Sequence, residues 1–318
     1  MIRITAANAI KFIRTRAPLW WLRTQYELRW RYGPNASSRR RWRAERGALT
    51  QVQRRVVQSL VARGIACVLF QDLTVDCERW NELSADAETF AHSPRVANSI
   101  ARYRSTFADP QGPAAAYLVK LHKEGPRFTV ENPLLRVGLG APVLDTVNAY
   151  LGLWAKLVYA DVWHSIPVDV GRRIGSQHWH RDPEDRMMVK AYLYFSDVHA
   201  GAGPMEYVPG SCSEGGGPYH HLWPWKPRGS RYPLEEEFNH RVPVADRMAC
   251  LGPPGTLVFC DTNGLHRGGI ATTGVRLVAT WTFVTPAGMS TLAPRRFVVE
   301  DLEASQSRLS PAARYALT

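Results

Sequence analysis

The second half of the chain constrains the fold most, because it is a series of short β-rich runs separated by glycine and proline turns. Apolar and β-branched runs bounded by such turns are typical of antiparallel strands. Many short strands joined by tight turns predict a β-sandwich or a jelly roll. The runs span 156–168, 188–195, 205–208, 256–260 and 276–284, with turns at 201–204, 209–211 and 252–255.

The first half has helical periodicity instead. Thr50 and Gln53 have capping-box spacing, and the apolar stripe that follows stops at Gly64, a residue type that commonly ends helices. Helices followed by antiparallel strands predict an α+β protein. The other expected elements are helices at 78–106 and 145–153 and strands at 65–70 and 117–121.

The formal net charge of the 318-residue chain is +12, and the whole excess lies near its start. Residues 1–55 contain 14 basic and two acidic side chains, whereas the other 263 residues contain 26 of each. A basic extension, 1–47, therefore precedes a charge-balanced domain, 48–318. We do not expect nucleic acid as a partner, because such a protein would carry basic residues among its core elements.

The basic extension allows several roles. Arginine and bulky apolar residues alternate as far as residue 33, Pro18 is expected to divide two short helices, and 33–38 is expected to form a loop. Packing of these helices on the domain is the first expectation. The alternatives are peripheral contact with an anionic membrane, contact with nucleic acid, and a transit peptide.

The cysteines and the hydropathy bear on the compartment. Five cysteines without CxxC spacing predict free thiols in a reducing compartment rather than a zinc site. No uninterrupted apolar window reaches the ~18 residues of a membrane-spanning helix. We expect a cytoplasmic protein, with the peripheral membrane contact of 1–47 as the alternative.

Three residues have the spacing of a metal site. His180 and Asp182 stand two apart before a predicted strand, so in an extended segment their side chains point to the same face. His266 follows another predicted strand, and its return beside this pair would give two imidazoles and one carboxylate. That set is typical of non-haem Fe(II) oxygenases, which keep open coordination positions.

Arg276 lies ten residues after His266, on the last long strand. An inward arginine among apolar neighbours needs an anionic partner, and a dicarboxylate cosubstrate would supply one through a bidentate pair.

These motifs resemble the phytanoyl-CoA hydroxylase-like branch of Fe(II)/2-oxoglutarate oxygenases. The resemblance covers roughly 48–286 and rests on HWHRD at 178–182, GPMEYVPGS at 203–211, PGTLVF at 254–259, GLHRG at 264–268, and Arg276. It implies a double-stranded β-helix core with helices packed on its major sheet.

The resemblance also implies a ligand set and a reaction. His180, Asp182 and His266 would hold Fe(II), and Arg276 would bind the far carboxylate of 2-oxoglutarate. Tyr192 and Lys120 match positions near that cosubstrate. With O2 as oxidant, the implied reaction is hydroxylation of an unactivated C–H bond in a small metabolite, natural product, or lipid- or sugar-linked intermediate, with release of succinate and CO2.

Three positions help to choose among the different reactions that Fe(II)/2-oxoglutarate oxygenases catalyse. Cys212 replaces the histidine that commonly follows the Pro-Gly-Ser turn. Asp182 is a carboxylate, which argues against halogenation, and Thr282 stands where nucleic-acid-demethylating relatives have a second arginine. Desaturation, epimerisation or ring closure could use the same iron site. A non-catalytic jelly-roll protein with a vestigial metal site is the alternative of another class.

Substrate contacts are expected around this centre. The insertion 212–254 is long enough to be a lid, and its aromatic and cationic residues could hold a polar molecule. A surface charge network near the mouth of the site is also expected, from Arg181, Glu184, Asp185 and Arg186. The candidate substrate residues are Gln177, Lys190, Tyr194, Trp223 and Arg228; Lys190 and Tyr194 share the strand parity of Tyr192.

Overall fold

The computed structural model describes residues 19–74, 77–107, 117–122, 125–168, 173–226, 232–288 and 294–318. Within them the strands form a six-stranded antiparallel major sheet and a three-stranded antiparallel minor sheet. The major sheet has the order β1 (Ile65–Leu69), β8 (Thr256–Cys260), β5 (Met188–Tyr194), β10 (Leu277–Val284), β4 (Lys156–Ser165), β2 (Leu118–Lys120). The minor sheet has the order β7 (Met248–Ala249), β6 (Met205–Tyr207), β9 (His266–Gly268).

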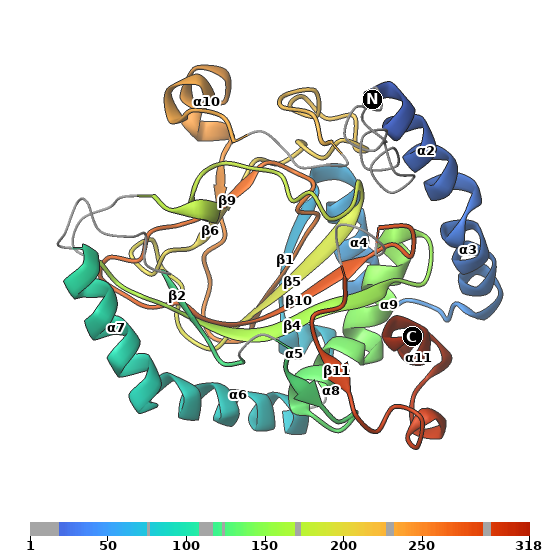
Figure 1. The fold of residues 1–318 in the computed structure, drawn as a ribbon, viewed down its shortest axis with the longest axis horizontal. Helices are drawn as coiled ribbons and strands as arrows, with labels where there is room; N and C mark the ends of the chain where they lie inside the picture. The colour runs from blue at the N-terminus through green and yellow to red at the C-terminus, as the bar shows by residue number, and fades with distance from the viewer. Residues whose placement is uncertain are drawn as a thin grey trace, which may run out of the picture.

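Helices cover the outer face of the major sheet, and the minor sheet faces its inner side. Figure 1 shows α6 and α7 beneath the major sheet and strands β6 and β9 above it. The α+β jelly-roll prediction is therefore confirmed. The helices on or beside the sheet are α4 (Gln51–Arg63), α5 (Phe70–Leu73), α6 (Cys77–Ala91), α7 (Pro94–Phe107), α8 (Pro133–Leu139), α9 (Ala141–Leu151) and α11 (Pro311–Leu317). A short parallel pair, β3 (Arg127–Phe128) with β11 (Val298–Val299), completes the strands, and η3 (Gln306–Arg308) precedes α11.

Strand β10 shows why the two faces differ. Its side chains alternate, as they must in a pleated strand. Trp281 and Phe283 point outward into the large core under the helices, and the Trp281 indole donates to the Leu134 carbonyl at 2.8 Å. Val278 points inward and packs with Tyr194 and Tyr207 between the two sheets. The inner face therefore has room for a site, whereas the outer face is occupied by apolar packing.

The expected helix boundaries hold in part. Thr50 and Gln53 form the predicted capping box, and Gly64 ends α4 with a φ of 78°, a conformation that favours glycine. The single helix expected over 78–106 is two helices, because Pro94 begins α7 after a break at 92–93.

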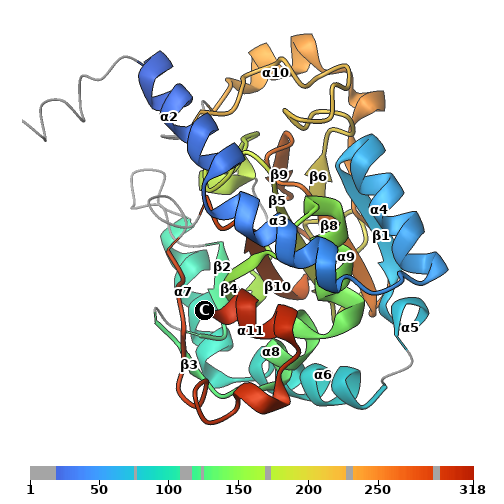
Figure 2. The same cartoon turned by 90° about the vertical axis from the view of Figure 1, so that its right-hand side faces the viewer.

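The loop expected at 33–38 is wrong. Helix α2 (Leu19–Tyr32) ends before Gly33, and α3 (Pro34–Glu45) begins there with Pro34 at its first position, where the missing N–H costs nothing. Asn35 and Ser38 are buried and hydrogen-bond to the jelly-roll domain, so packing overrides their usual preference for turns. Figure 2 shows α2 and α3 lying across the side of the molecule beside α9 and α11.

The insertion 212–254 has structure of its own. Its described part contains α10 (Glu235–Arg241), η2 (Val244–Asp246) and β7, which pairs with β6. In the described part of the chain, no helix has the length and apolar character needed to cross a membrane.

Candidate metal centre

The backbone brings two distant histidines side by side. His180 and His266 exchange both of their backbone hydrogen bonds, each at 3.0 Å, in an isolated antiparallel bridge. Their ring centroids are 4.3 Å apart. Asp182, two residues further on, is fixed by its own N–H to the Thr262 carbonyl at 2.8 Å. The predicted same-face arrangement of His180 and Asp182 and the return of His266 are both present.

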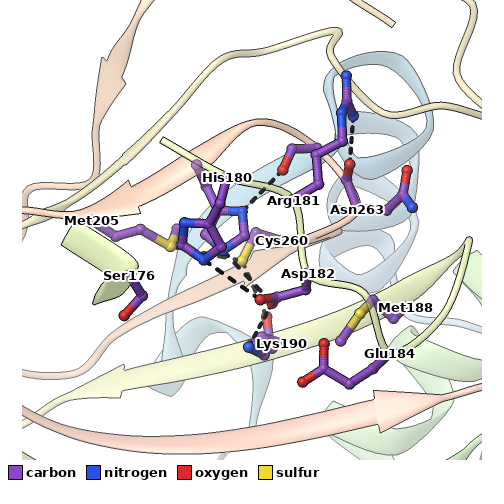
Figure 3. A network of polar contacts seen from close by, with 12 residues as sticks. Ser176, His180, Arg181, Asp182, Glu184, Met188, Lys190, Met205, Cys260 and Asn263 are labelled. Atoms are coloured by element: carbon purple, nitrogen blue, oxygen red, sulfur yellow. Dashed lines mark hydrogen bonds and ion pairs between the residues drawn. The ribbon is translucent and has the colours of Figure 1, made fainter. Parts of the chain in front are cut away.

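The three side chains have the donor geometry of a metal site. One ligand atom from each of His180, Asp182 and His266 lies within 4.8 Å of the others, and all three side chains are buried. Each histidine Nε2 is 3.6 Å from an oxygen of Asp182. Figure 3 shows the His180 ring and the Asp182 carboxylate facing a common point above β5.

Two backbone carbonyls set the histidine tautomers. Nδ1 of His180 lies 2.8 Å from the His178 carbonyl, and Nδ1 of His266 lies 2.9 Å from the Gly264 carbonyl. A carbonyl only accepts, so both Nδ1 atoms donate, and each Nε2 presents a lone pair in the neutral ring. Two lone pairs and a carboxylate facing one another repel unless a cation lies between them.

The surroundings of His266 and Asp182 keep these two donors in their ligating forms. Burial, with His180 nearby, lowers the pKa of His266 to about 3, so the ring is neutral at neutral pH. Burial alone would raise the pKa of Asp182. Lys190, with His266 and His180, outweighs that effect and holds this pKa well below its ordinary value. The Lys190 ammonium lies 2.5 Å from Asp182 Oδ2, and the carboxylate raises the pKa of Lys190 against the effect of burial.

Arg276 and Tyr192 line the same pocket. The pocket has a volume of about 80 Å³ and is bounded by the three candidate ligands, Lys190, Met205 and Trp163. Arg276 is buried, and its Nε has no hydrogen-bond partner among the described residues. A buried guanidinium with an unused donor is suited to an anionic ligand. Burial raises the pKa of Tyr192, so its phenol stays protonated and can donate a hydrogen bond.

The other predicted residues lie elsewhere. Lys120 does not line this pocket but an adjoining cavity. The Tyr194 hydroxyl donates to the Cys250 carbonyl at 2.9 Å, deep between the sheets. Gln177, in η1 (Gly175–Gln177), accepts from the Ile174 N–H at 3.0 Å. Trp223 packs on Phe238 in a small apolar cluster, and Arg228 lies outside the described residues.

The expected surface charge network is wrong for two of its members. Arg181 is only 1% exposed and Asp185 is fully buried. Arg181 points away from the ligands on either side of it, as strand alternation requires, and Figure 3 shows it directed toward Asn263. Its guanidinium donates to six backbone carbonyls, those of Ser211, Tyr219, His220, Leu222, Trp223 and Asn263.

Arg181 thus connects the metal-ligand segment to the insertion. Arg267 makes a second connection, with two bonds to Glu206 at 2.9 and 3.0 Å and one to Glu235 of α10 at 2.7 Å. A third contact is Tyr232, whose ring stacks on His180 with centroids 5.3 Å apart. The position of each arginine beside a ligand was visible in the sequence. The partners were not, because those of Arg181 are backbone carbonyls of distant segments and those of Arg267 are two glutamates far from it in sequence.

The N-terminal helices also contact this region. The Tyr26 hydroxyl donates to Asp185 Oδ1 at 2.5 Å, and the Tyr26 ring lies 5.0 Å from that of Trp225 in the insertion. Arg186 pairs with both Glu27 of α2 and Glu214. The segment that follows Asp182 is therefore held from both sides.

Comparison with known proteins identifies the fold but not a family. No family model matches the chain, and no curated protein matches it. Among solved structures, EctD from S. alaskensis with 2-oxoglutarate and 5-hydroxyectoine is 19% identical, with a TM-score of 0.50, 85% of this chain and 90% of that chain covered. The apoform of EctD is 18% identical and has the same TM-score, and the match covers 80% of this chain and 90% of that chain. The epimerase SnoN with Fe3+, alpha ketoglutarate and nogalamycin RO is 15% identical, with a TM-score of 0.47. The match covers 76% of this chain and 89% of that chain. At these identities the likeness establishes the jelly-roll fold alone.

Proposed function

We propose that this protein is a non-haem Fe(II)- and 2-oxoglutarate-dependent dioxygenase that hydroxylates a small molecule. One observation carries the proposal. Donor atoms of His180, Asp182 and His266 face one point, and a buried arginine with an unused N–H lines the same pocket. The fold shared with EctD, which has been solved with 2-oxoglutarate, supports it. Membership of the phytanoyl-CoA hydroxylase-like branch is a proposal that rests on the sequence motifs.

The residues present fit this metal and this cosubstrate. Two imidazoles and one carboxylate leave open coordination positions, as an oxygenase needs. Fe(II), 2-oxoglutarate and O2 together supply an oxidant able to attack an unactivated C–H bond, releasing succinate and CO2.

The chain contributes positioning and charge. The carbonyls of His178 and Gly264 hold both imidazoles as Nε2 donors, and Lys190 keeps Asp182 ionised. We assign Arg276 to the far carboxylate of the cosubstrate and Tyr192 to a hydrogen bond beside it, because both side chains line the pocket. The side chains of His180, Asp182, His266 and Arg276 are buried, and the low dielectric around them strengthens each of these interactions.

Replacement of Arg276 by glutamine tests the cosubstrate assignment. We expect the affinity for 2-oxoglutarate to fall roughly 10- to 100-fold, the effect of losing hydrogen bonds to a charged group. The measurement is an anaerobic titration of the Fe(II) protein, followed by the metal-to-ligand charge-transfer band. Arg40→Gln removes an equal charge on exposed α3 and serves as the matched control. Equal affinities in the two variants would contradict the assignment.

The titration and a metabolite screen also separate the alternative functions. A non-catalytic jelly-roll protein would give no charge-transfer band and no substrate-driven succinate. Among catalytic outcomes, hydroxylation adds one oxygen atom to the product, desaturation or ring closure removes two hydrogens, and epimerisation leaves the mass unchanged. Mass spectrometry of the product therefore distinguishes hydroxylation, which we propose, from the others.

A further inference from the structure

A second cavity adjoins the metal pocket. It has a volume of about 160 Å³ and shares two lining residues, Trp163 and Lys190, with the first pocket. That volume exceeds the ~30 Å³ share of one water molecule several-fold, so it admits a substituent of several atoms. Its other lining residues are Lys120, Val158, Tyr159, Glu184, Thr282, Pro294 and Arg296.

The cavity is rich in positive charge. Lys120, Lys190 and Arg296 line it, against the single carboxylate of Glu184. The contact between Arg296 and Glu184 is long, at 4.0 Å, and Lys190 is already engaged with Asp182.

Lys120 is held toward the cavity by aromatic faces rather than by an acid. Its ammonium lies 5.7 Å from the Tyr159 ring centroid and 5.8 Å from that of Trp163. No carboxylate of the described residues pairs with it within 4.0 Å. Asp161, on the same strand as Tyr159 and Trp163, accepts from the Tyr159 hydroxyl and contacts His122 Nδ1. Cation–π contacts position an ammonium without neutralising it.

The charge balance persists when the metal pocket is full. Arg267, which also lines the metal pocket, is paired with Glu206 and Glu235. The other charged side chains that line the two chambers are four cations, Lys120, Lys190, Arg276 and Arg296, and two carboxylates, Asp182 and Glu184. A divalent metal adds two positive charges, and a bound dicarboxylate adds two negative charges, so their contributions cancel. A net charge of +2 therefore faces whatever enters the second cavity, and in a partly buried site such an excess selects an anion.

We propose that the second cavity binds a carboxylate or phosphate group of the substrate between Lys120 and Arg296, which makes the substrate a small anion. This inference rests on the proposed function for the identity of the reaction, but not for the binding itself. Lys190 forms the boundary between the two chambers, so the substrate carbon that reacts lies on the metal side of Lys190. Lys120 thereby has a role at the substrate rather than at the cosubstrate.

Calorimetric titration with inorganic phosphate, and separately with acetate, tests this site. The variants are Lys120→Met, Arg296→Met and their combination, and Arg40→Met is the control that removes one charge on exposed α3. In the anaerobic Fe(II)–2-oxoglutarate complex, we expect the double variant to bind the preferred anion at least about tenfold more weakly than wild type, since charge-assisted hydrogen bonds are lost. Arg40→Met should match wild type. Tighter phosphate or tighter acetate identifies the group.

A second set of titrations tests the anion site without relying on the proposed function. The same titrations on metal-free Arg276→Gln, with and without the double substitution, remove the other anion site. If the Fe(II)–2-oxoglutarate complex does not form, the proposed function fails while this second set still tests the cavity. The anion site is overturned if phosphate and acetate do not bind, or if the double variant titrates like Arg40→Met.

Discussion

At the scale of single residues, the candidate metal centre depends on protonation states set by burial and by backbone carbonyls. The signal for its ligands was fully local: the parity of His180 and Asp182, and one histidine after a strand. The residues that hold the ligands in place could not be predicted in the same way. Lys190 was expected at the site as a substrate contact, whereas the structure places its ammonium on Asp182.

His266 gives the metal-free protein an acid sensitivity. Burial lowers its pKa from 6.5 to about 3, so the unfolded chain takes up this proton at a higher pH than the folded chain does. The contribution to stability is therefore present above pH 6.5 and is lost progressively as the pH falls toward 3. We expect His266→Gln to flatten the fall in unfolding free energy between pH 7.5 and pH 5, measured by denaturant titration in chelator. His92→Gln, at an exposed histidine, is the control, and equal slopes in the two variants would contradict the interpretation.

At the scale of elements, the two sheets were predictable and the insertion was not. Short strands with alternating faces and glycine turns are a local pattern, whereas pairings such as β1 with β8 join segments far apart in the sequence. The insertion has few apolar residues in sequence, yet Trp223 and Phe238 form a core with Trp179 and Leu265. Its attachment through Arg181 uses carbonyl groups, which every residue has and no sequence pattern reveals.

Arg181→Met should release the insertion. Loss of the guanidinium leaves six carbonyls without this donor, and the contacts of Arg181 with Tyr219 and His220 are only partly buried. We expect a cost of about 3–5 kcal/mol, the range for breaking a buried charged contact. Limited proteolysis should then cut within 212–247 much faster than in wild type. Arg241→Met, an exposed arginine in α10, should leave the cleavage rate unchanged. Protection of the insertion in both variants would show that Arg181 does not hold it.

At the scale of the whole molecule, the basic extension is attached to the domain through its described helices. Asn35 and Ser38 are buried against it, and Tyr26 contacts Asp185 beside the metal-ligand segment. We propose that 1–47 is a packing extension of the jelly-roll domain, 48–318. Membrane contact stays a proposal that rests on the exposed arginines of α3, and salt-dependent sedimentation with anionic vesicles tests it.

Tyr26→Phe tests whether the extension supports the domain. Burial raises the pKa of Asp185 to about 6, although Tyr26 and Thr285 partly offset it. Because the folded protein raises the pKa of Asp185, this carboxyl contributes to stability below pH 3.8, and that contribution is lost as the pH rises through about 6. The Tyr26 hydrogen bond favours the charged form, so its loss should cost about 1–3 kcal/mol at pH 8 and less at pH 5. Thermal unfolding at the two pH values measures this, with Tyr32→Phe, an exposed tyrosine, as control. A cost that does not grow with pH would contradict it.

The mutual backbone bridge between His180 and His266 has a consequence for the order of biosynthesis. The two residues are 86 positions apart, and neither imidazole has its partner until the later strand is paired. On a ribosome, a nascent chain that ends before residue 266 has two of the three donors and no closed minor sheet. Such contacts between distant segments form slowly. If the site binds iron as proposed, loading can begin only late in synthesis, after His266 has paired, and a fragment truncated after β8 can fold no complete metal centre.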